Sequence, residues 1–156
     1  MCSAGCTTTA SITRSPVAAL ARPGNPRRRA SLGRVAQRVL AWEHAPANSH
    51  VDITLLSAPR MRHLNRRATG RRGLTDVIAY PLPQPDGRVC GDVYICPEAA
   101  ARAAENGVTL GEELVRLAVH GTLHVLGYDH PEGAGRTRSL MWRRQERYVR
   151  RLRRSR

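Results

Sequence analysis

The segment that most constrains the fold is residues 114–126, which is apolar on nearly every side when drawn as an α-helix. Arg116 is its only side chain of fixed charge. Thr109 and Glu112 precede it with the spacing of a capping box, which predicts where the helix begins. A helix that is apolar all round belongs in the middle of a protein. The chain is therefore predicted to build its core around this helix.

Shorter patterns predict further helices and a few strands. One helix is predicted after Ser31, which is a candidate N-cap. Its apolar residues have the spacing of one helical face: Leu32, Val35, Ala36, Val39 and Leu40. Other helices are expected near Met61, after Pro97 and over residues 136–153. The last of these has an apolar face made of Leu140, Met141, Tyr148, Val149 and Leu152. Strands are expected at residues 17–20, 51–56, 75–80 and 91–96, and the mixture indicates an α+β fold.

A chain of 156 residues has the size of one domain. We expect a disordered tail at residues 1–15, a single domain at residues 16–150 and a basic C-terminal tail at residues 151–156. The first 42 residues contain no acidic side chain, so an organelle transit peptide is the alternative interpretation of this end. No apolar run approaches the ~20 residues of a membrane span, so no membrane partner is expected.

The charge of the chain indicates its partners. It has 26 basic residues, all of them arginine, against 12 acidic residues, for a net charge of +14. Polyanions such as nucleic acids are the natural partners of such a surface, although a merely solvated basic surface is the alternative. Residues 66–73 are expected to form an exposed basic loop whose arginines are Arg66, Arg67, Arg71 and Arg72.

Three histidines carry the chemistry of the chain. His120 and His124 are four residues apart on the predicted central helix, so their imidazoles project from the same face. Gly127 can adopt a positive φ, end the helix and return His130 towards them. Three nitrogen ligands and one open position favour zinc, which lowers the pKa of a bound water towards roughly 7. The sequence therefore predicts one Zn²⁺ per chain.

Two other interpretations of this cluster stay open. A closed structural zinc site would need a fourth protein ligand, and Cys90 or Cys96 could serve if the fold brought one close. The spacing also resembles that of metzincin peptidases, but position 121 is Gly121 where their general-base glutamate stands. The four cysteines do not resemble a disulfide framework, so a reducing compartment is expected; they are Cys2, Cys6, Cys90 and Cys96.

The segment His-Gly-Thr-Leu-His-Val-Leu-Gly-Tyr-Asp-His at residues 120–130 resembles the YbeY family of bacterial rRNA maturation factors and endoribonucleases. Upstream motifs in the same order support the resemblance: Leu64-Asn65, Thr75-Asp76-Val77-Ile78 and Gly91-Asp92-Val93. The resemblance implies a small mixed β-sheet packed with helices, and a buried central helix with two metal-ligand histidines. It transfers His120, His124 and His130 as metal ligands. Asp129 is expected to support a ligand histidine from outside the metal site.

The resemblance also implies a function. We expect the domain to be a metal-dependent hydrolase that cleaves single-stranded RNA, in maturation of the 16S rRNA 3′ end and in ribosome quality control. Its expected partners are rRNA and the small ribosomal subunit, with a ribosomal protein or assembly GTPase, in the cytoplasm. A non-catalytic assembly factor with structural zinc and, more weakly, a metallopeptidase are the alternatives. No side chain qualifies as a general base.

One departure from the family concerns RNA binding. The family places an aromatic residue and an RNA-facing arginine where this chain has Ala68 and Thr69. Phosphate contacts tolerate changes of position, so the four arginines of the predicted loop are candidates to replace that arginine. The sequence leaves open which of them does so.

Overall fold

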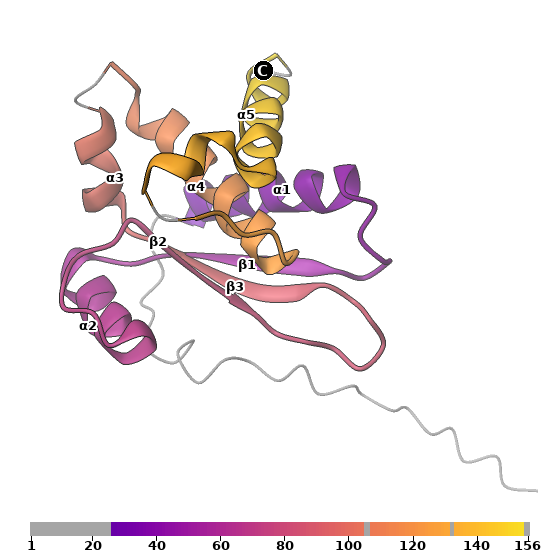
Figure 1. Ribbon diagram of the computed structural model, residues 1–156, viewed down its shortest axis with the longest axis horizontal. Coiled ribbons are helices and arrows are strands. Elements are labelled where there is room, and N and C mark those ends of the chain that lie inside the picture. The colour runs from indigo at the N-terminus through magenta and orange to yellow at the C-terminus, as the bar shows by residue number, and fades with distance from the viewer. Residues whose placement is uncertain (1–25, 105–106, 132, 155–156) are drawn as a thin grey trace, which may run out of the picture.

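The computed structural model describes residues 26–104, 107–131 and 133–154 (Figure 1). The predicted tail at residues 1–15, the predicted strand at 17–20 and the thiols of Cys2 and Cys6 lie outside the described residues. The described elements, in chain order, are α1 (Pro26–Trp42), β1 (His50–Leu55), α2 (Ala58–Thr69), β2 (Val77–Pro81), β3 (Cys90–Ile95), α3 (Pro97–Ala104), α4 (Leu110–Val125), the 3₁₀-helix η2 (Gly133–Arg138) and α5 (Leu140–Arg153). None of these helices is long and apolar enough to cross a membrane.

The three strands form one mixed sheet in the order β1-β3-β2. β1 lies parallel to β3, with Val51 opposite Gly91, and β2 lies antiparallel to β3, with Tyr80 opposite Asp92. Alternate residues of β3 face opposite sides of the sheet, as a strand requires. The predicted α+β fold with a small mixed sheet is confirmed.

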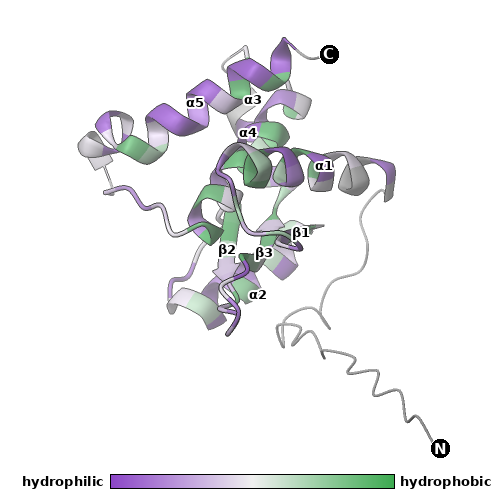
Figure 2. Cartoon of the chain, turned by 90° about the vertical axis from the view of Figure 1, so that its right-hand side faces the viewer, coloured by the Kyte–Doolittle hydropathy of each residue, from purple (hydrophilic) through white to green (hydrophobic). Residues whose placement is uncertain are grey.

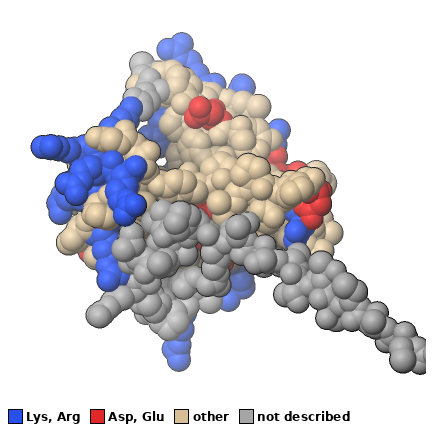
Figure 3. All heavy atoms as spheres, turned by 90° about the horizontal axis from the view of Figure 1, so that it is seen from below, with Lys and Arg blue, Asp and Glu red and all other residues tan. Residues whose placement is uncertain are grey.

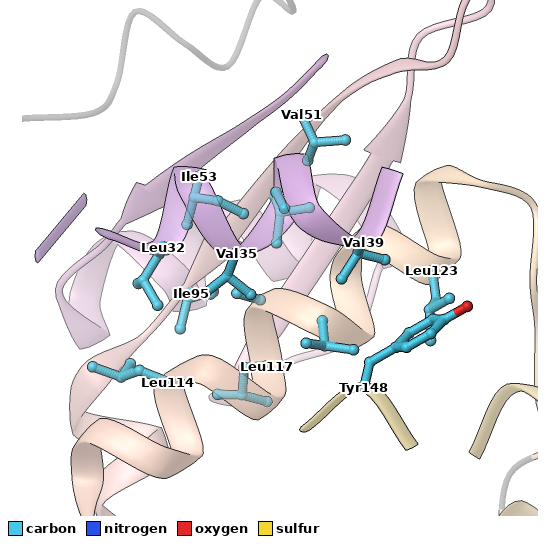
Figure 4. Packing of buried hydrophobic residues seen from close by; sticks show 14 of the residues in the cluster. Leu32, Val35, Val39, Val51, Ile53, Ile95, Leu114, Leu117, Leu123 and Tyr148 are labelled. Carbon is cyan, nitrogen blue, oxygen red and sulfur yellow. The ribbon is translucent and has the colours of Figure 1, made fainter. Parts of the chain in front are cut away.

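The two faces of the sheet are covered unequally (Figure 1). On one face, α1, α4 and α5 enclose the main core, in which Ile53 and Ile95 of the sheet pack with Val39 of α1 and Leu117 of α4 (Figure 4). The hydropathy colouring shows this apolar layer between α1, α4 and the strands (Figure 2). On the other face, α2 covers a smaller cluster made of Leu56, Met61, Leu64, Tyr94 and Cys96.

Helix α4 is the predicted central helix, and ten of its 16 residues are buried. The capping box is present: Thr109 Oγ1 accepts the Glu112 N–H at 3.2 Å, and Glu112 Oε2 accepts the Thr109 N–H at 3.1 Å. The helix lies so close to the sheet that a Cβ on Gly121 would be 2.4 Å from Val93 Cγ1. Glycine at position 121 is therefore required by the packing of α4 on β3.

Two helix predictions are wrong in detail. α1 begins at Pro26, so Ser31 lies inside the helix and is not its N-cap. α2 continues to Thr69 and ends at Gly70, whose φ is 72°, so Arg66 and Arg67 are helical and only Arg71 and Arg72 lie in a loop. Local arginine content predicted exposure correctly but not backbone conformation, because arginine is itself a good helix former.

Two further boundaries differ from the sequence prediction. β2 begins at Val77 instead of residue 75, because the Asp76 carboxylate accepts the Val77 N–H at 2.9 Å just before the strand. The last helix is split, since Ser139 accepts the Trp142 N–H at 3.1 Å and caps α5 after η2. Leu140, predicted on the apolar face, is 52% exposed at this new helix start. α5 continues beyond residue 150 as far as Arg153.

Candidate metal centre and adjoining groove

Three imidazoles meet at the end of α4. His120 and His124 lie one turn apart on the same face of the helix, with 3.1 Å between their Nε2 atoms. Gly127, with a φ of 88°, turns the chain after the helix and brings His130 back to them. Each ring offers a nitrogen, and the three nitrogens lie within 4.8 Å of one another. The structure thus brings together the three histidines that the sequence singled out.

Hydrogen bonds at the outer nitrogens fix the direction of two rings. His120 Nδ1 lies 2.8 Å from Gln145 Oε1, and His130 Nδ1 lies 3.1 Å from the Pro131 carbonyl oxygen. Both partners are acceptors, so each Nδ1 carries the proton and each Nε2 keeps a lone pair. His130 Nε2 is buried, and no described residue hydrogen-bonds to it. A buried nitrogen lone pair without a hydrogen-bond partner fits a metal ligand.

The environment keeps the rings of His120 and His124 neutral. Burial lowers the pKa of His120 from 6.5 to about 4, and hydrogen bonding to Gln145 only partly opposes this. Burial and the neighbouring His130 also lower the pKa of His124. Neutral imidazole is the form that binds a divalent metal, so His120 and His124 are in the right protonation state at neutral pH.

Within the described part of the chain, no cysteine belongs to the cluster. Among the described residues, the group of close potential ligands consists of the three histidines alone. Cys90 Sγ instead lies 3.6 Å from His50 Nδ1, and Cys96 Sγ lies 3.5 Å from Glu98 Oε2. The geometry therefore gives no support to a site closed by Cys90 or Cys96, and three protein ligands leave room for a further one.

Asp129 lies at the edge of the cluster. Its Oδ1 is 3.9 Å from His124 Nδ1 and accepts the His130 N–H at 2.8 Å. Its side chain is 87% exposed. The carboxylate thus fixes the backbone at His130 and stays near His124, as a supporting group would.

Sequence reasoning did not identify Gln145, which is 1% exposed on α5. The sequence does contain one signal for this residue: Gln145 falls within the predicted apolar face of the last helix, between Met141 and Val149. A polar side chain in that position needs a buried partner. Its partner, His120, is 25 residues away in the chain, and spacing alone does not identify such a pair.

A second group that sequence reasoning did not identify surrounds Glu43, whose side chain is 6% exposed at the end of α1. Its carboxylate accepts hydrogen bonds from Tyr128 at 2.7 Å, from Tyr148, and from Arg144 at 2.7 and 2.9 Å. Burial alone would raise the pKa of Glu43, but these hydrogen bonds outweigh it and lower the pKa. Because Tyr128 is two residues before His130, Glu43 ties the turn that carries His130 to α1 and α5.

An open groove of about 690 Å³ adjoins the cluster, and His120 and His124 form part of its wall. Arg71 and Arg72 also line it, together with β2 residues such as Ile78. Arginine side chains gather over α2 and the loop after it (Figure 3). The groove therefore places cationic side chains and the three-histidine centre within one concave surface.

Thr69 and Asn65 hold the loop that carries these arginines. Thr69 Oγ1 donates to the Asn65 carbonyl oxygen at 2.9 Å and accepts the Arg71 N–H at 3.2 Å. Asn65 Nδ2 donates to the Gly73 carbonyl oxygen at 3.2 Å. Thr69, at the position of the family's arginine, is thus a loop-fixing residue in this chain, and the cationic side chains follow it. Of the four predicted arginines, Arg71 and Arg72 line the groove, whereas Arg66 and Arg67 are exposed on the last turn of α2.

Known proteins are similar to this chain in sequence. A family model described as Endoribonuclease YbeY matches residues 25–153. A protein named Endoribonuclease YbeY from Sulfurihydrogenibium sp. is 46% identical over 87 residues, which are 53% of this chain and 57% of that protein. Proteins of the same name are 38% identical over 110 residues in Mycolicibacterium gilvum (63% of this chain, 62% of that protein) and 38% identical over 128 residues in Micrococcus luteus (76% and 80%).

A solved structure is also similar to this chain. The solution structure of TM1509 from Thermotoga maritima has a TM-score of 0.58 and 28% identity, over 83% of each chain. The chain spans 57% and 62% of the length of the first two curated relatives above.

Proposed function

This chain belongs to the endoribonuclease YbeY family, and from that premise we propose that it is a metal-dependent endoribonuclease acting on single-stranded RNA. The observation that carries the proposal is the groove in which Arg71 and Arg72 share a concave surface with His120 and His124. Phosphodiester hydrolysis needs a cationic surface for the substrate and a centre that activates water, and this groove combines the two.

We propose that His120, His124 and His130 hold one divalent ion and that the ion is zinc, because three neutral imidazoles suit zinc. When bound, such an ion polarises a phosphoryl oxygen and makes water a better nucleophile. Gln145 and the Pro131 carbonyl hold the two ring tautomers that present Nε2 to this centre. Asp129 supports the turn through the His130 N–H.

The arginines of α2 and of the loop after it are the proposed substrate-binding residues. We propose that Arg71 and Arg72 contact the phosphates of the strand in the groove, in place of the family's arginine at position 69. Arg66 and Arg67 point to solvent from α2 and are proposed to contact RNA outside the groove. No side-chain general base is assigned. Gly121 occupies the position of the metzincin glutamate, and the packing of α4 on Val93 leaves no space for a side chain there.

The proposed biological role is maturation of the 16S rRNA 3′ end and ribosome quality control in the cytoplasm. The proposed partners are rRNA and the small ribosomal subunit, with a ribosomal protein or assembly GTPase. The excess of arginine supports contact with RNA. A non-catalytic assembly factor with structural zinc is the alternative, and the absence of a fourth protein ligand among the described donors counts against it. A metallopeptidase is disfavoured by Gly121.

The test compares the purified chain with His124→Ala on a single-stranded RNA fragment from the 16S 3′ region and on its duplex. His63→Ala, which removes an exposed histidine of α2, is the matched control. We expect cleavage of the single strand by the wild type and the control, inhibition by a chelator, recovery with Zn²⁺, and no cleavage by His124→Ala.

Circular dichroism checks that each variant is folded. Equal cleavage by all three proteins would refute the enzyme proposal. A folded His124→Ala variant without cleavage supports it, whereas RNA binding without cleavage by the wild type would favour the assembly factor. Chelator-sensitive hydrolysis of casein would favour the peptidase.

A further inference from the structure

Helix α5 has two opposite faces. Its buried face consists of Met141, Gln145, Tyr148, Val149 and Leu152. Its outer face and its C-cap carry exposed arginines at spacings of four, three and four residues, which are Arg143, Arg147, Arg150 and the C-cap residue Arg154. Eleven residues at 1.5 Å per residue give a stripe about 16 Å long on one side of the helix. We call these four residues the α5 stripe; it lies opposite Gln145 and therefore on the side of α5 away from His120.

The fold does not use most of the charge of the α5 stripe. The single acidic residue of α5, Glu146, pairs with Arg116 of α4. Within the described ranges, no carboxylate pairs with Arg143, Arg150 or Arg154. Neighbouring like charges repel one another, so a bound polyanion would relieve this repulsion.

Two other arginines of the same helix show the contrast. Arg144 donates to the buried carboxylate of Glu43, and Arg153 lies 3.2 Å from Glu112. These two arginines connect α5 to α1 and α4. Among the described residues, the α5 stripe makes no such connection to another element; Arg147 contacts the hydroxyl of its neighbour Tyr148.

An aromatic side chain flanks the α5 stripe. Trp142 lies beside it, with the Arg136 guanidinium of η2 5.7 Å from its ring centroid. Trp142, Arg143 and Arg150 line an open hollow of about 640 Å³. Arginines together with an aromatic ring suit RNA, because the cations bind phosphates and the ring can stack on a base.

The chemistry of this face does not suit a protein partner. Leu140, which lines the hollow together with Trp142, is the single large apolar side chain that is exposed in the described part of the chain, so the apolar surface here is small beside the charge of the arginines. Protein interfaces need an apolar centre with few charges, whereas nucleic-acid interfaces are polar and strongly positive. The ribbon of α5 is hydrophilic along most of its length (Figure 2).

We propose that the α5 stripe binds the phosphate backbone of RNA at a second surface, separate from the groove beside the three histidines. The two surfaces lie on opposite sides of α5, so a short strand that fills the groove does not reach the stripe. A longer RNA contacts both, and the stripe adds affinity for long substrates only. This binding needs no cleavage step and is therefore independent of the proposed activity.

The test compares Arg143→Gln/Arg150→Gln with the control Arg34→Gln/Arg102→Gln. All four positions are exposed on helices, so both double variants remove the same charge. Affinity is measured by fluorescence anisotropy in chelator, over a range of salt, for a long fragment of small-subunit rRNA and for a short single-stranded oligonucleotide.

For the long fragment we expect the stripe variant to bind about tenfold more weakly, and its salt slope to fall by roughly 1.4, or 0.7 for each lost phosphate contact. The control variant keeps its affinity within about twofold, and both variants bind the short oligonucleotide like the wild type. If both variants lost the same affinity for the long fragment, the loss would be due to net charge alone, and the proposal would be overturned. Unchanged binding by the stripe variant would also overturn it. If polyglutamate displaced the long RNA from the wild type but not from the stripe variant, the stripe would be a site for an acidic protein surface, and the RNA proposal would be overturned.

Discussion

The three-histidine centre and the arginine loop share one groove but are built differently. The centre rests on hydrogen bonds between distant elements, a buried one from His120 to Gln145 and a part-buried one from Tyr128 to Glu43. The loop rests on short-range bonds from Thr69 and Asn65 to their own neighbours. A metal needs ligands in fixed positions, whereas a phosphate tolerates a mobile cation. We therefore expect substitutions that support the centre to lower the free energy of unfolding more than substitutions in the loop.

The largest difference in stability between the two regions is expected from a substitution at Glu43, compared with one in the loop. Glu43→Gln should destabilise the protein by about 3 kcal/mol, because it leaves the Arg144 guanidinium half-buried without its carboxylate. In the loop, Thr69→Val removes hydrogen bonds that are exposed or only part-buried, and it should cost about 1 kcal/mol or less. Urea denaturation of both variants measures the free energies of unfolding. Equal costs would show that the two regions do not differ.

The pH dependence of stability should also belong to the centre. The unfolded chain protonates His120 near pH 6.5, but the folded protein does so only at about 4. Neutral His120 therefore contributes fully to the free energy of unfolding above pH 6.5. This contribution, about 3 kcal/mol in the metal-free protein, is lost as the pH falls towards 4. The lowered pKa of His124 acts in the same direction.

Denaturation of the metal-free protein between pH 7.5 and pH 5 checks this. The pKa of Glu43 is lowered from its ordinary value and lies below this range, whereas burial raises the pKa of Glu113, which acts on stability in the opposite direction. His120→Gln should flatten the dependence, while His63→Gln, on the exposed side of α2, should keep it. A wild type whose stability does not change over this range would contradict the buried, neutral state of His120.

A third prediction uses two glycines. Gly121→Ala should cost about 1 to 3 kcal/mol, because its methyl group would lie 2.4 Å from Val93 Cγ1 in a close-packed layer. Gly73→Ala is the counterpart in the loop, where no atom lies within 4 Å of the new methyl group, and it should be nearly neutral. Thermal denaturation measures both. A neutral Gly121→Ala would mean that α4 can move away from β3 at little cost.

The smallest effect is expected from the loop arginines. Arg71→Gln/Arg72→Gln should raise KM for single-stranded RNA about tenfold with little change in kcat or stability, because it removes phosphate contacts only. Arg71→Lys/Arg72→Lys should restore most of the loss. Arg66→Gln/Arg67→Gln is the matched control on α2 and should change KM less. A larger effect from the control would assign the groove contact to α2.

Much of the centre could be predicted because its chemistry depends on near neighbours in the chain. The spacing of His120 and His124 and the turn at Gly127 are local properties. The capping box and the apolar surface of α4 are local as well, and both predictions are confirmed. The boundaries of β2 and α5 were predicted less well, because they depend on side-chain bonds from Asp76 and Ser139 that compete with the backbone pattern.

By itself, the sequence determined the α+β class, the central helix and the grouping of the three histidines, since periods of three and four residues specify which side chains share a helix face. Tertiary structure alone decided which arginines enter the groove, and which residues hold the rings. Gln145 and Glu43 act across 25 and 85 residues of chain, and no local period connects such positions. Close packing likewise decided that position 121 is glycine, because the reason lies in Val93 on a strand that only folding brings beside it.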